Sequence, residues 1–563
     1  MTLTKMNLAR RALCCWAGAA MLASVLPWSV QAATAGPELD VLITHARIVD
    51  GSGNPWYRGS LGLRDGRIVE IGVPAARRPA KRVIDAKDRV VAPGFIDLMG
   101  QDTFVYLKDP AAAQSRLYQG ITTHVSGEGS SLAPQNERTQ PKPRVLGAEQ
   151  LRWRSYAEYF RILETHGLPI NVAHNVGAAQ VRSVVMGDQD RAPTAAELQQ
   201  MKELVAQAMR DGAFGLSTAL IYPPGAYATT AELVELARVA GEYGGVYTSH
   251  MRNESGGLLG AIDETLRIGA QAHLPVHIYH LKAAGRANWP LMAKAIEHID
   301  AARRRGVDVT ADIYPYIRNG IDLASFLPPA FYAQGHEAAF KQLKRPAVRA
   351  QLRAELERTD GDWENWYQHV GADWSKVLIT DSSGYPRDVT GLSVAGVAEK
   401  EGRDIWETFF DLAAAYVDVA PESMNEEQKH QALRAPWVMI ETDTPPVNIA
   451  TAKSTHPRAL GAFPRVFAKY VREDGVLAME DAVRRMTSLV ANRLGMHDRG
   501  RIALGMAADL VIFDPATIQD QATFEKPLQL STGVEYLLIN GQLSIDGGRA
   551  TGALVGRVLR HGQ

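Results

Sequence analysis

The middle of the chain, from about residue 93 to residue 496, alternates short apolar runs with amphipathic stretches. The amphipathic stretches have helical periodicity, as in TAAELQQMKELVAQAMRDG and TAELVELARVAGEYG. The apolar runs have the length and β-branched content of buried strands: PINVAHNVG, AFGLSTAL, GGVYTSHMR, LPVHIYHLK, VDVTADIYPY, KVLITDS and WVMIETD. Strand–helix alternation over roughly 400 residues favours an α/β fold of the (β/α)₈ TIM-like barrel type over a doubly wound sheet. No glycine-rich phosphate loop opens these helices, which disfavours a Rossmann fold.

The two ends of the chain show a different pattern, with short alternating strands and tight turns. Residues 38–92 contain VLITHARIVDGSG and the hairpin LGLRDGRIVEIG, and residues 497–563 contain ADLVIFDP and VEYLLINGQLSIDGG. Both ends together predict a small β-sandwich domain beside the barrel at 93–496. A polar stretch rich in Trp, Lys and Arg, about 329–375, is expected to be an insertion in a barrel loop.

The first 32 residues have the pattern of a signal peptide. Lys5, Arg10 and Arg11 precede an apolar run at 12–26, and a small-x-small cleavage motif follows at 30–32. The alternative is a retained N-terminal anchor helix, although the apolar run is short for a membrane span. We therefore expect an exported, periplasmic or secreted protein with no stable span in the mature chain. The pattern leaves open whether export follows the general secretory or the twin-arginine route.

Charge and cysteine content narrow the possible functions. The 563-residue chain carries 61 Lys and Arg against 62 Asp and Glu, a balance that disfavours nucleic-acid binding or attachment to membranes by charge. Its length predicts two or three domains. The two cysteines, Cys14 and Cys15, both lie in the expected signal peptide. The mature chain would then have no disulfide, thiol nucleophile or thiolate metal ligand.

Several predicted strands end in a side chain that can bind a metal ion. VYTSH ends at His250, VHIYH at His280 and VMIETD at Asp443, while Glu128 follows another short strand in GITTHVSGEGSS. The two histidines are about one βα repeat apart, which on a barrel places both imidazoles on the same catalytic rim. Catalytic zinc needs about three protein ligands and an open position for water or substrate. The pattern therefore indicates a metal-dependent hydrolase.

Other polar residues near these strands have structural interpretations. His277 lies three residues before His280, so in an extended strand the two side chains point to opposite faces. His273 precedes the strand. Both are therefore expected to be structural. Asp97 is expected to brace the first loop through hydrogen bonds. Asp312, in ADIYPY, is left as either a ligand or a brace.

With these residues in place, the chain resembles the N-acyl-D-amino-acid deacylase (D-aminoacylase) family of the amidohydrolase superfamily. The resemblance covers about residues 40 to 555. It rests on the blocks APGFID, GITT, SLAP, GLSTALIYPPGAYA, YTSHMRNE, HLKAAG, DIYPY, HPRALGAFPRV and ADLVIFDPATIQDQATFEKP. It implies a (β/α)₈ barrel, a small β-domain from both termini and an insertion near the active site, in agreement with the pattern above.

The resemblance also implies a ligand set. In the family, a cysteine and two histidines hold a tightly bound zinc, and the histidines match His250 and His280. The family cysteine falls on Glu128 when the SLAP block is aligned. The aspartate that acts on water matches Asp443.

This chain departs from the family at the first barrel strand. The family's His-x-His pair, which serves a second and weaker metal position, is Met99 and Gln101 here. The departure implies the loss of one metal but leaves the set of Glu128, His250 and His280 complete. A carboxylate in place of a thiolate still suits zinc. We therefore expect one zinc per chain.

The implied reaction is hydrolysis of an N-acyl-D-amino acid to a carboxylate and a D-amino acid, with Asp443 as the proton shuttle. The substrate carries a carboxylate and needs a cation in the pocket. Lys282 and Tyr314 match family positions that hold it, and Arg318 and Arg458 are weaker candidates.

Two alternative functions remain compatible with the sequence. Loss of the His-x-His pair is compatible with a non-catalytic scaffold or binding protein, and a related amidohydrolase could act on another amide or a dipeptide. A serine hydrolase is disfavoured, because residues 391–395, GLSVA, lack the second glycine of a nucleophile elbow. The sequence does not specify the acyl group, the D-amino acid or the oligomeric state.

Overall fold

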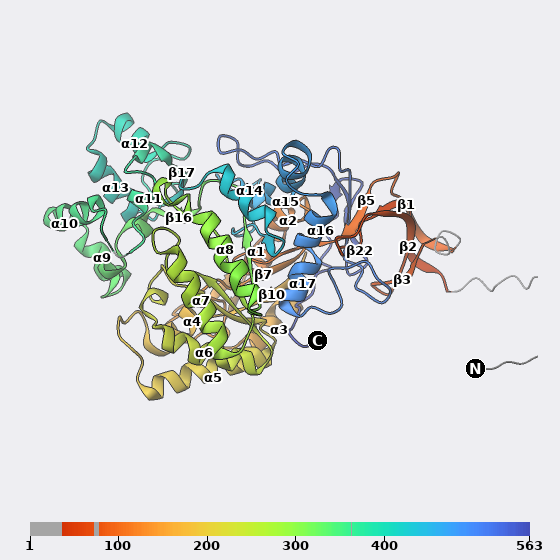
Figure 1. The fold of residues 1–563 in the computed structure, drawn as a ribbon, viewed down its shortest axis with the longest axis horizontal. Helices are drawn as coiled ribbons and strands as arrows, with labels where there is room; N and C mark the ends of the chain where they lie inside the picture. Colours follow the sequence, from red (N-terminus) through yellow and green to blue (C-terminus); the bar gives the residue numbers. More distant parts are fainter. Residues whose placement is uncertain (1–36, 73–77, 362) are drawn as a thin grey trace, which may run out of the picture.

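A computed structural model describes residues 37–72, 78–361 and 363–563 (Figure 1). The predicted signal peptide lies outside these ranges, so the proposed export rests on the sequence pattern. Within these ranges, no helix has both the length and the apolar character needed to cross a membrane.

The centre of the molecule is built from parallel strands that follow one another in chain order. They are β6 (Phe95–Asp97), β7 (Ile121–Ser126), β10 (Asn171–His174), β11 (Val176–Gly177), β12 (Gly215–Ala219), β13 (Val246–His250), β14 (Val276–Ile278), β15 (Val309–Ile313) and β19 (Val438–Ile440). The Asp443 amide, just after β19, donates to the Met99 carbonyl, just after β6, over 2.9 Å. This contact brings the last strand beside the first. Parallel pairing in this order is the arrangement expected of a (β/α)₈ barrel.

Amphipathic helices cover the outside of these strands (Figure 1). The main ones are α5 (Ala195–Asp211), α6 (Thr230–Glu242), α7 (Leu258–Ala272) and α8 (Leu291–Arg304). Helix α5 begins with a capping box between Thr194 and Glu197 and ends at Gly212 in the left-handed region. Its buried face includes Met201 and Val205. The helical period predicted for this stretch is therefore confirmed.

The two chain ends together form one nine-stranded sheet at the right of Figure 1. Its strands are β1 (Leu39–Ile48), β2 (Tyr57–Arg64), β3 (Arg67–Ile71), β4 (Ala80–Asp85), β5 (Val90–Pro93), β20 (Leu510–Phe513), β21 (Val534–Ile539), β22 (Gln542–Asp546) and β23 (Arg549–Ala550). The predicted turns are present, with positive φ at Asp65 and Gly66 and at Asn540 and Gly541. Alternate side chains of β5 and β20 point to opposite faces, so one face of the sheet has its own core and the other joins the barrel core.

A segment between β15 and β19 folds around a separate hydrophobic core, at the left of Figure 1. Phe326, Trp374 and Phe409 stack at its centre, with ring centroids 5.7 and 4.7 Å apart. Its elements are β16 (Ile321–Asp322), α9 (His336–Gln342), α10 (Pro346–Glu357), α11 (Trp366–His369), β17 (Val377–Asp381), α12 (Val394–Glu401), α13 (Ile405–Ala414) and β18 (Asp418–Pro421). The insertion expected at 329–375 lies inside this inserted segment.

Candidate active site

A cavity of about 670 Å³ opens where the carboxyl ends of the barrel strands face the inserted segment. His250 is the last residue of β13, and Glu128, His280 and Asp443 follow β7, β14 and β19 at short distances. All four line this catalytic cavity. The strand-end positions identified in the sequence therefore converge on one space.

Glu128, His250 and His280 have the geometry of a ligand set. Glu128 Oε1 lies 2.8 Å from His250 Nδ1 and 3.5 Å from His280 Nε2. One donor atom from each residue lies within 4.8 Å of the other two. The hydrogen bonds to the two histidines hold the pKa of Glu128 well below its ordinary value, although its burial acts in the opposite direction. Two imidazole nitrogens and a carboxylate suit zinc, so the residues fit the metal that the resemblance implies.

Glu254 is a buried member of the site that the sequence reasoning missed. Its Oε1 lies 2.9 Å from His280 Nδ1, and both carboxylate oxygens lie 2.6 Å from Lys282 Nζ. Its Oε2 is 3.5 Å from His250 Nε2. One carboxylate thus faces the outer nitrogens of both candidate ligands, an arrangement that fixes the tautomer and orientation of metal-binding imidazoles. The available signal was the position of Glu254 four residues after His250.

A second cluster of potential ligands is formed by His250, Glu254 and Glu364. Glu364 comes from the inserted segment and accepts the Glu254 backbone amide. We do not interpret this cluster as a metal site, because His250 Nδ1 faces Glu128 and Nε2 then carries the ring proton. Burial, followed by the charge of Glu254, raises the pKa of Glu364 to about 8.

Asp443 lies beside the ligand set and is held by two neighbours. Its Oδ2 is 2.7 Å from Arg458 Nη1, and its Oδ1 accepts a hydrogen bond from Gln101 Nε2 over 3.1 Å. Burial raises the pKa of Asp443 above its ordinary value, with a further contribution from Glu128, while Arg458 acts in the opposite direction. Positive φ angles at Gln101, His280 and Asp443 (66°, 36° and 48°) show that the backbone is strained around this site.

The residues expected to be structural brace the barrel rim. Asp97 accepts the Thr442 amide and hydroxyl over 3.0 and 2.6 Å, and it forms a fully buried ion pair with Arg116 at 3.3 Å. Asp312 bonds His277 Nε2 over 2.9 Å and accepts the His280 backbone amide. The open question about Asp312 is thereby answered, because it positions the His280 backbone and is not in the candidate ligand set.

The four candidate substrate-binding residues separate into two groups. Lys282, Tyr314 and Arg458 line the catalytic cavity, and the Arg458 guanidinium lies 4.3 Å from the centroid of the Tyr314 ring. Arg458 Nε is a buried donor without a hydrogen-bond partner among the described residues, whereas Nη1 is paired with Asp443. The prediction for Arg318 is corrected, because Arg318 pairs with Glu422 over 2.8 Å and does not line the cavity.

Comparison with known proteins identifies the family. The amidohydrolase family model matches residues 82–545. A D-aminoacylase from Alcaligenes xylosoxydans xylosoxydans is 34% identical over 92% of this chain and 97% of its own length. An N-acyl-D-glutamate deacylase from the same organism is 35% identical over 90% of this chain and 93% of its own length. The chain belongs to the D-aminoacylase family of amidohydrolases. Its fold is accordingly the (β/α)₈ barrel that the sequence pattern predicted.

Solved structures of the family support the same assignment. An N-acyl-D-glutamate deacylase from Bordetella bronchiseptica, complexed with zinc and a phosphonate mimic of the tetrahedral intermediate, has a TM-score of 0.77 and 33% identity. A D-aminoacylase crystal structure has a TM-score of 0.76 and 31% identity. Each comparison covers 93% of this chain and all of the other.

The two positions at which the family resemblance implies a His-x-His pair hold Met99 and Gln101 in this chain. Met99 is 3% exposed and packs in a hydrophobic cluster instead of facing the catalytic cavity. The Gln101 amide nitrogen lies 3.1 Å from both Glu128 Oε2 and Asp443 Oδ1. Both carboxylates can only accept when ionised, so the amide group facing them is the NH₂ donor. The neutral amide of Gln101 therefore lies within hydrogen-bond distance of both the Glu128 and the Asp443 carboxylates.

Proposed function

We propose that the protein is a zinc-dependent hydrolase of N-acyl-D-amino acids, releasing a carboxylate and a D-amino acid. The observation that carries the proposal is the convergence of Glu128, His250 Nδ1 and His280 Nε2 beside Asp443 at the carboxyl rim of the barrel. Family relatives with D-aminoacylase and N-acyl-D-glutamate deacylase activity support it.

Glu128, His250 and His280 would hold the zinc ion. Bound there, zinc supplies Lewis-acid polarisation of the amide carbonyl and acidifies water. Glu254 orients the His280 imidazole through its Nδ1 and lies 3.5 Å from Nε2 of His250, so one carboxylate serves the outer side of both rings. Burial lowers the pKa of His280, but the Glu254 and Glu128 carboxylates more than offset this and bring the pKa to about 9. This imidazolium must lose its proton when a metal binds.

Asp443 is the proposed proton shuttle. Its carboxylate accepts the proton of the attacking water and then returns it to the nitrogen of the leaving amine. A pKa raised by burial brings the carboxyl closer to the operating pH, which favours both steps. Arg458 and Gln101 hold the two oxygens, so the side chain stays aimed at the catalytic cavity.

The substrate carboxylate is proposed to bind at Arg458 and Tyr314. Arg458 Nη1 is held by Asp443, but Nε has no hydrogen-bond partner among the described residues and remains available to a carboxylate. Lys282 lies in the same cavity, but both oxygens of Glu254 hold its ammonium group. Lys282 therefore contributes positive charge to the pocket, whereas Arg458 keeps one donor, Nε, without a partner among the described residues.

The test of the proposed function is a screen of N-acetyl-D-amino acids against their L-enantiomers, with purified, zinc-loaded protein. We expect release of free amine from at least one D-substrate and a strong preference for D over L. Hydrolysis of L-substrates alone, or of other amides and dipeptides alone, would favour the related amidohydrolase. A protein that neither binds zinc nor hydrolyses any of these amides would be a scaffold.

The metal count is a separate prediction. We expect about one tightly bound zinc per chain, because the two clusters of potential ligands among the described residues share His250, and only the set of Glu128, His250 and His280 is interpreted as a metal site. Gln101→Ala should leave this stoichiometry unchanged, since a neutral amide is a weak zinc ligand. Metal analysis after dialysis measures both.

The double variant Met99→His/Gln101→His is the matched control for the metal count. A histidine at position 101 would face the carboxylates of Glu128 and Asp443, and a polar histidine at position 99 should leave the hydrophobic cluster for the cavity, so titration should load a second zinc. Two tightly held metals in the unaltered protein would contradict the one-metal interpretation. Loss of zinc in Gln101→Ala would make Gln101 a ligand.

A further inference from the structure

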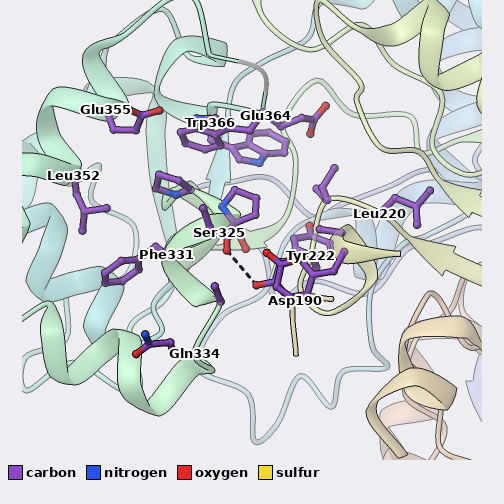
Figure 2. Close-up of a pocket in the computed structure, with 18 of the residues that line it drawn as sticks. Asp190, Leu220, Tyr222, Ser325, Phe331, Gln334, Leu352, Glu355, Glu364 and Trp366 are labelled. Carbon is purple, nitrogen blue, oxygen red and sulfur yellow. Dashed lines mark hydrogen bonds between the residues drawn. The ribbon is translucent and has the colours of Figure 1, made fainter. Parts of the chain in front are cut away.

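A second cavity, of about 870 Å³, lies beside the catalytic cavity, between the loop after β12 and the inserted segment (Figure 2). We propose that this acyl cavity receives an extended, uncharged acyl group of the substrate, such as a medium-chain fatty acyl group. The inference rests on the proposed deacylase function and deepens it by assigning a class of acyl group.

The two cavities adjoin each other at two aromatic side chains. Tyr222, from the loop after β12, and Trp366, the first residue of α11, line both of them. The Tyr222 ring packs edge-on against the imidazole of His250, with centroids 5.4 Å apart. The acyl cavity therefore begins one aromatic ring away from a candidate zinc ligand. An acyl chain attached to a carbonyl at that ligand reaches the second cavity by passing Tyr222.

The order of side chains across the site predicts the orientation in which the substrate binds. The rings of Tyr222, His250, His280 and Tyr314 follow one another with centroid separations of 5.4, 4.3 and 6.4 Å. Arg458 stacks on Tyr314, at the far end of this row. The proposed carboxylate site and the acyl cavity are thus at opposite ends of the row. A substrate with its amide at the histidines would extend its two ends in these two directions.

The lining of the acyl cavity suits an uncharged chain. Arg252 is the sole basic residue among its described lining residues, and it is paired with Glu264 over 2.9 Å and bonded to two backbone carbonyls. The described lining therefore offers an anion no unpaired basic side chain. Its apolar walls come from both sides: Leu220, Ile221, Tyr222, Phe331, Leu352 and Trp366. Figure 2 shows Leu220, Tyr222, Phe331, Leu352 and Trp366 around the cavity, together with the acidic side chains of Asp190, Glu355 and Glu364.

The experiment compares an N-acetyl-D-amino acid with the N-octanoyl derivative of the same amino acid. The exposed residues Ala330 and Gln351 line the acyl cavity, whereas the exposed Ala350, next to Gln351 on α10, does not. Ala330→Trp and Gln351→Trp therefore fill the cavity, and Ala350→Trp is the matched control. All three changes are at exposed positions and leave the core intact.

We expect the unaltered enzyme to prefer the octanoyl substrate in kcat/KM by at least about tenfold, the equivalent of burying two methylene groups. The filling variants should lose about this factor, mainly through a higher KM, because the interaction is equal in ground and transition states. Their kcat/KM for the N-acetyl substrate should stay unchanged. Ala350→Trp should behave as the unaltered enzyme with both substrates.

The outcomes separate the acyl cavity from the deacylase function itself. Suppose that the N-acetyl substrate is hydrolysed normally. If the unaltered enzyme then shows no preference for the octanoyl substrate, or if both filling variants keep that preference, the assignment of the acyl cavity is wrong and the deacylase function is unaffected. Equal losses for both substrates in the filling variants would also overturn it. Failure of the unaltered protein to hydrolyse either substrate would refute the proposed function, and the acyl cavity with it.

Discussion

Replacing Asp443 by asparagine is expected to lower turnover at least roughly 100-fold, the usual scale of general acid–base catalysis. Asparagine keeps the size of the side chain and its contact with Arg458, but it cannot accept the proton of water. Zinc content should stay unchanged, because Asp443 is not in the set formed by Glu128, His250 and His280. Initial rates and metal analysis of the same preparation measure the two quantities.

Asp381→Asn is the control for this variant. Asp381 also lines the catalytic cavity, but its carboxylate is bonded to the amide and hydroxyl of Ser383, remote from the ligand set. We expect near-normal turnover. Near-normal turnover in Asp443→Asn would exclude this aspartate from proton transfer, whereas loss of zinc would place it among the ligands.

Changes at Glu254 are expected to affect both metal binding and stability. Glu254→Gln should weaken zinc binding roughly 10- to 100-fold, as observed for residues that orient metal ligands. Glu254→Ala should also lower the free energy of unfolding by about 3–5 kcal/mol, because it leaves the buried Lys282 ammonium without its carboxylate partner. Zinc titration with a competing chelator and denaturant unfolding of the metal-free protein measure these effects.

A second change at Lys282 separates the two roles of Glu254. In Glu254→Ala/Lys282→Met the buried cation is absent, so most of the stability lost in Glu254→Ala should return. Zinc affinity should stay low, since the two imidazoles still lack their carboxylate. If zinc affinity recovers together with stability, Glu254 acts by supporting the fold alone and does not position the ligands.

Much of the architecture could be predicted because its signals are local. Strand and helix periods depend on which face each side chain buries, and the alternating pattern between 93 and 496 reports this directly. The Asp65–Gly66 and Asn540–Gly541 turns were predictable because positive φ restricts the residue types. His250, His280 and Asp443 were predictable because parallel strands bring their carboxyl ends to one rim.

The errors and omissions concern contacts between distant parts of the chain. Arg318 was a reasonable carboxylate ligand by residue type, but its guanidinium contacts Glu422, 104 residues away. Glu254 appeared as an ordinary polar residue in a loop. Its role follows from burial between His280 and Lys282, which is decided by how the loop packs under the inserted segment.

The sequence by itself determined the barrel, the two-ended β-domain and the residue types at the catalytic rim, because burial periodicity and strand ends are properties of neighbouring residues. The tertiary structure alone decided how the altered first strand is used. Gln101 donates to Glu128 and to Asp443, which is 342 residues away. No local pattern encodes that distance, because it depends on the last barrel strand returning beside the first. Because the last barrel strand lies beside the first, the neutral amide of Gln101 also lies between two carboxylates, each of which needs a hydrogen-bond partner.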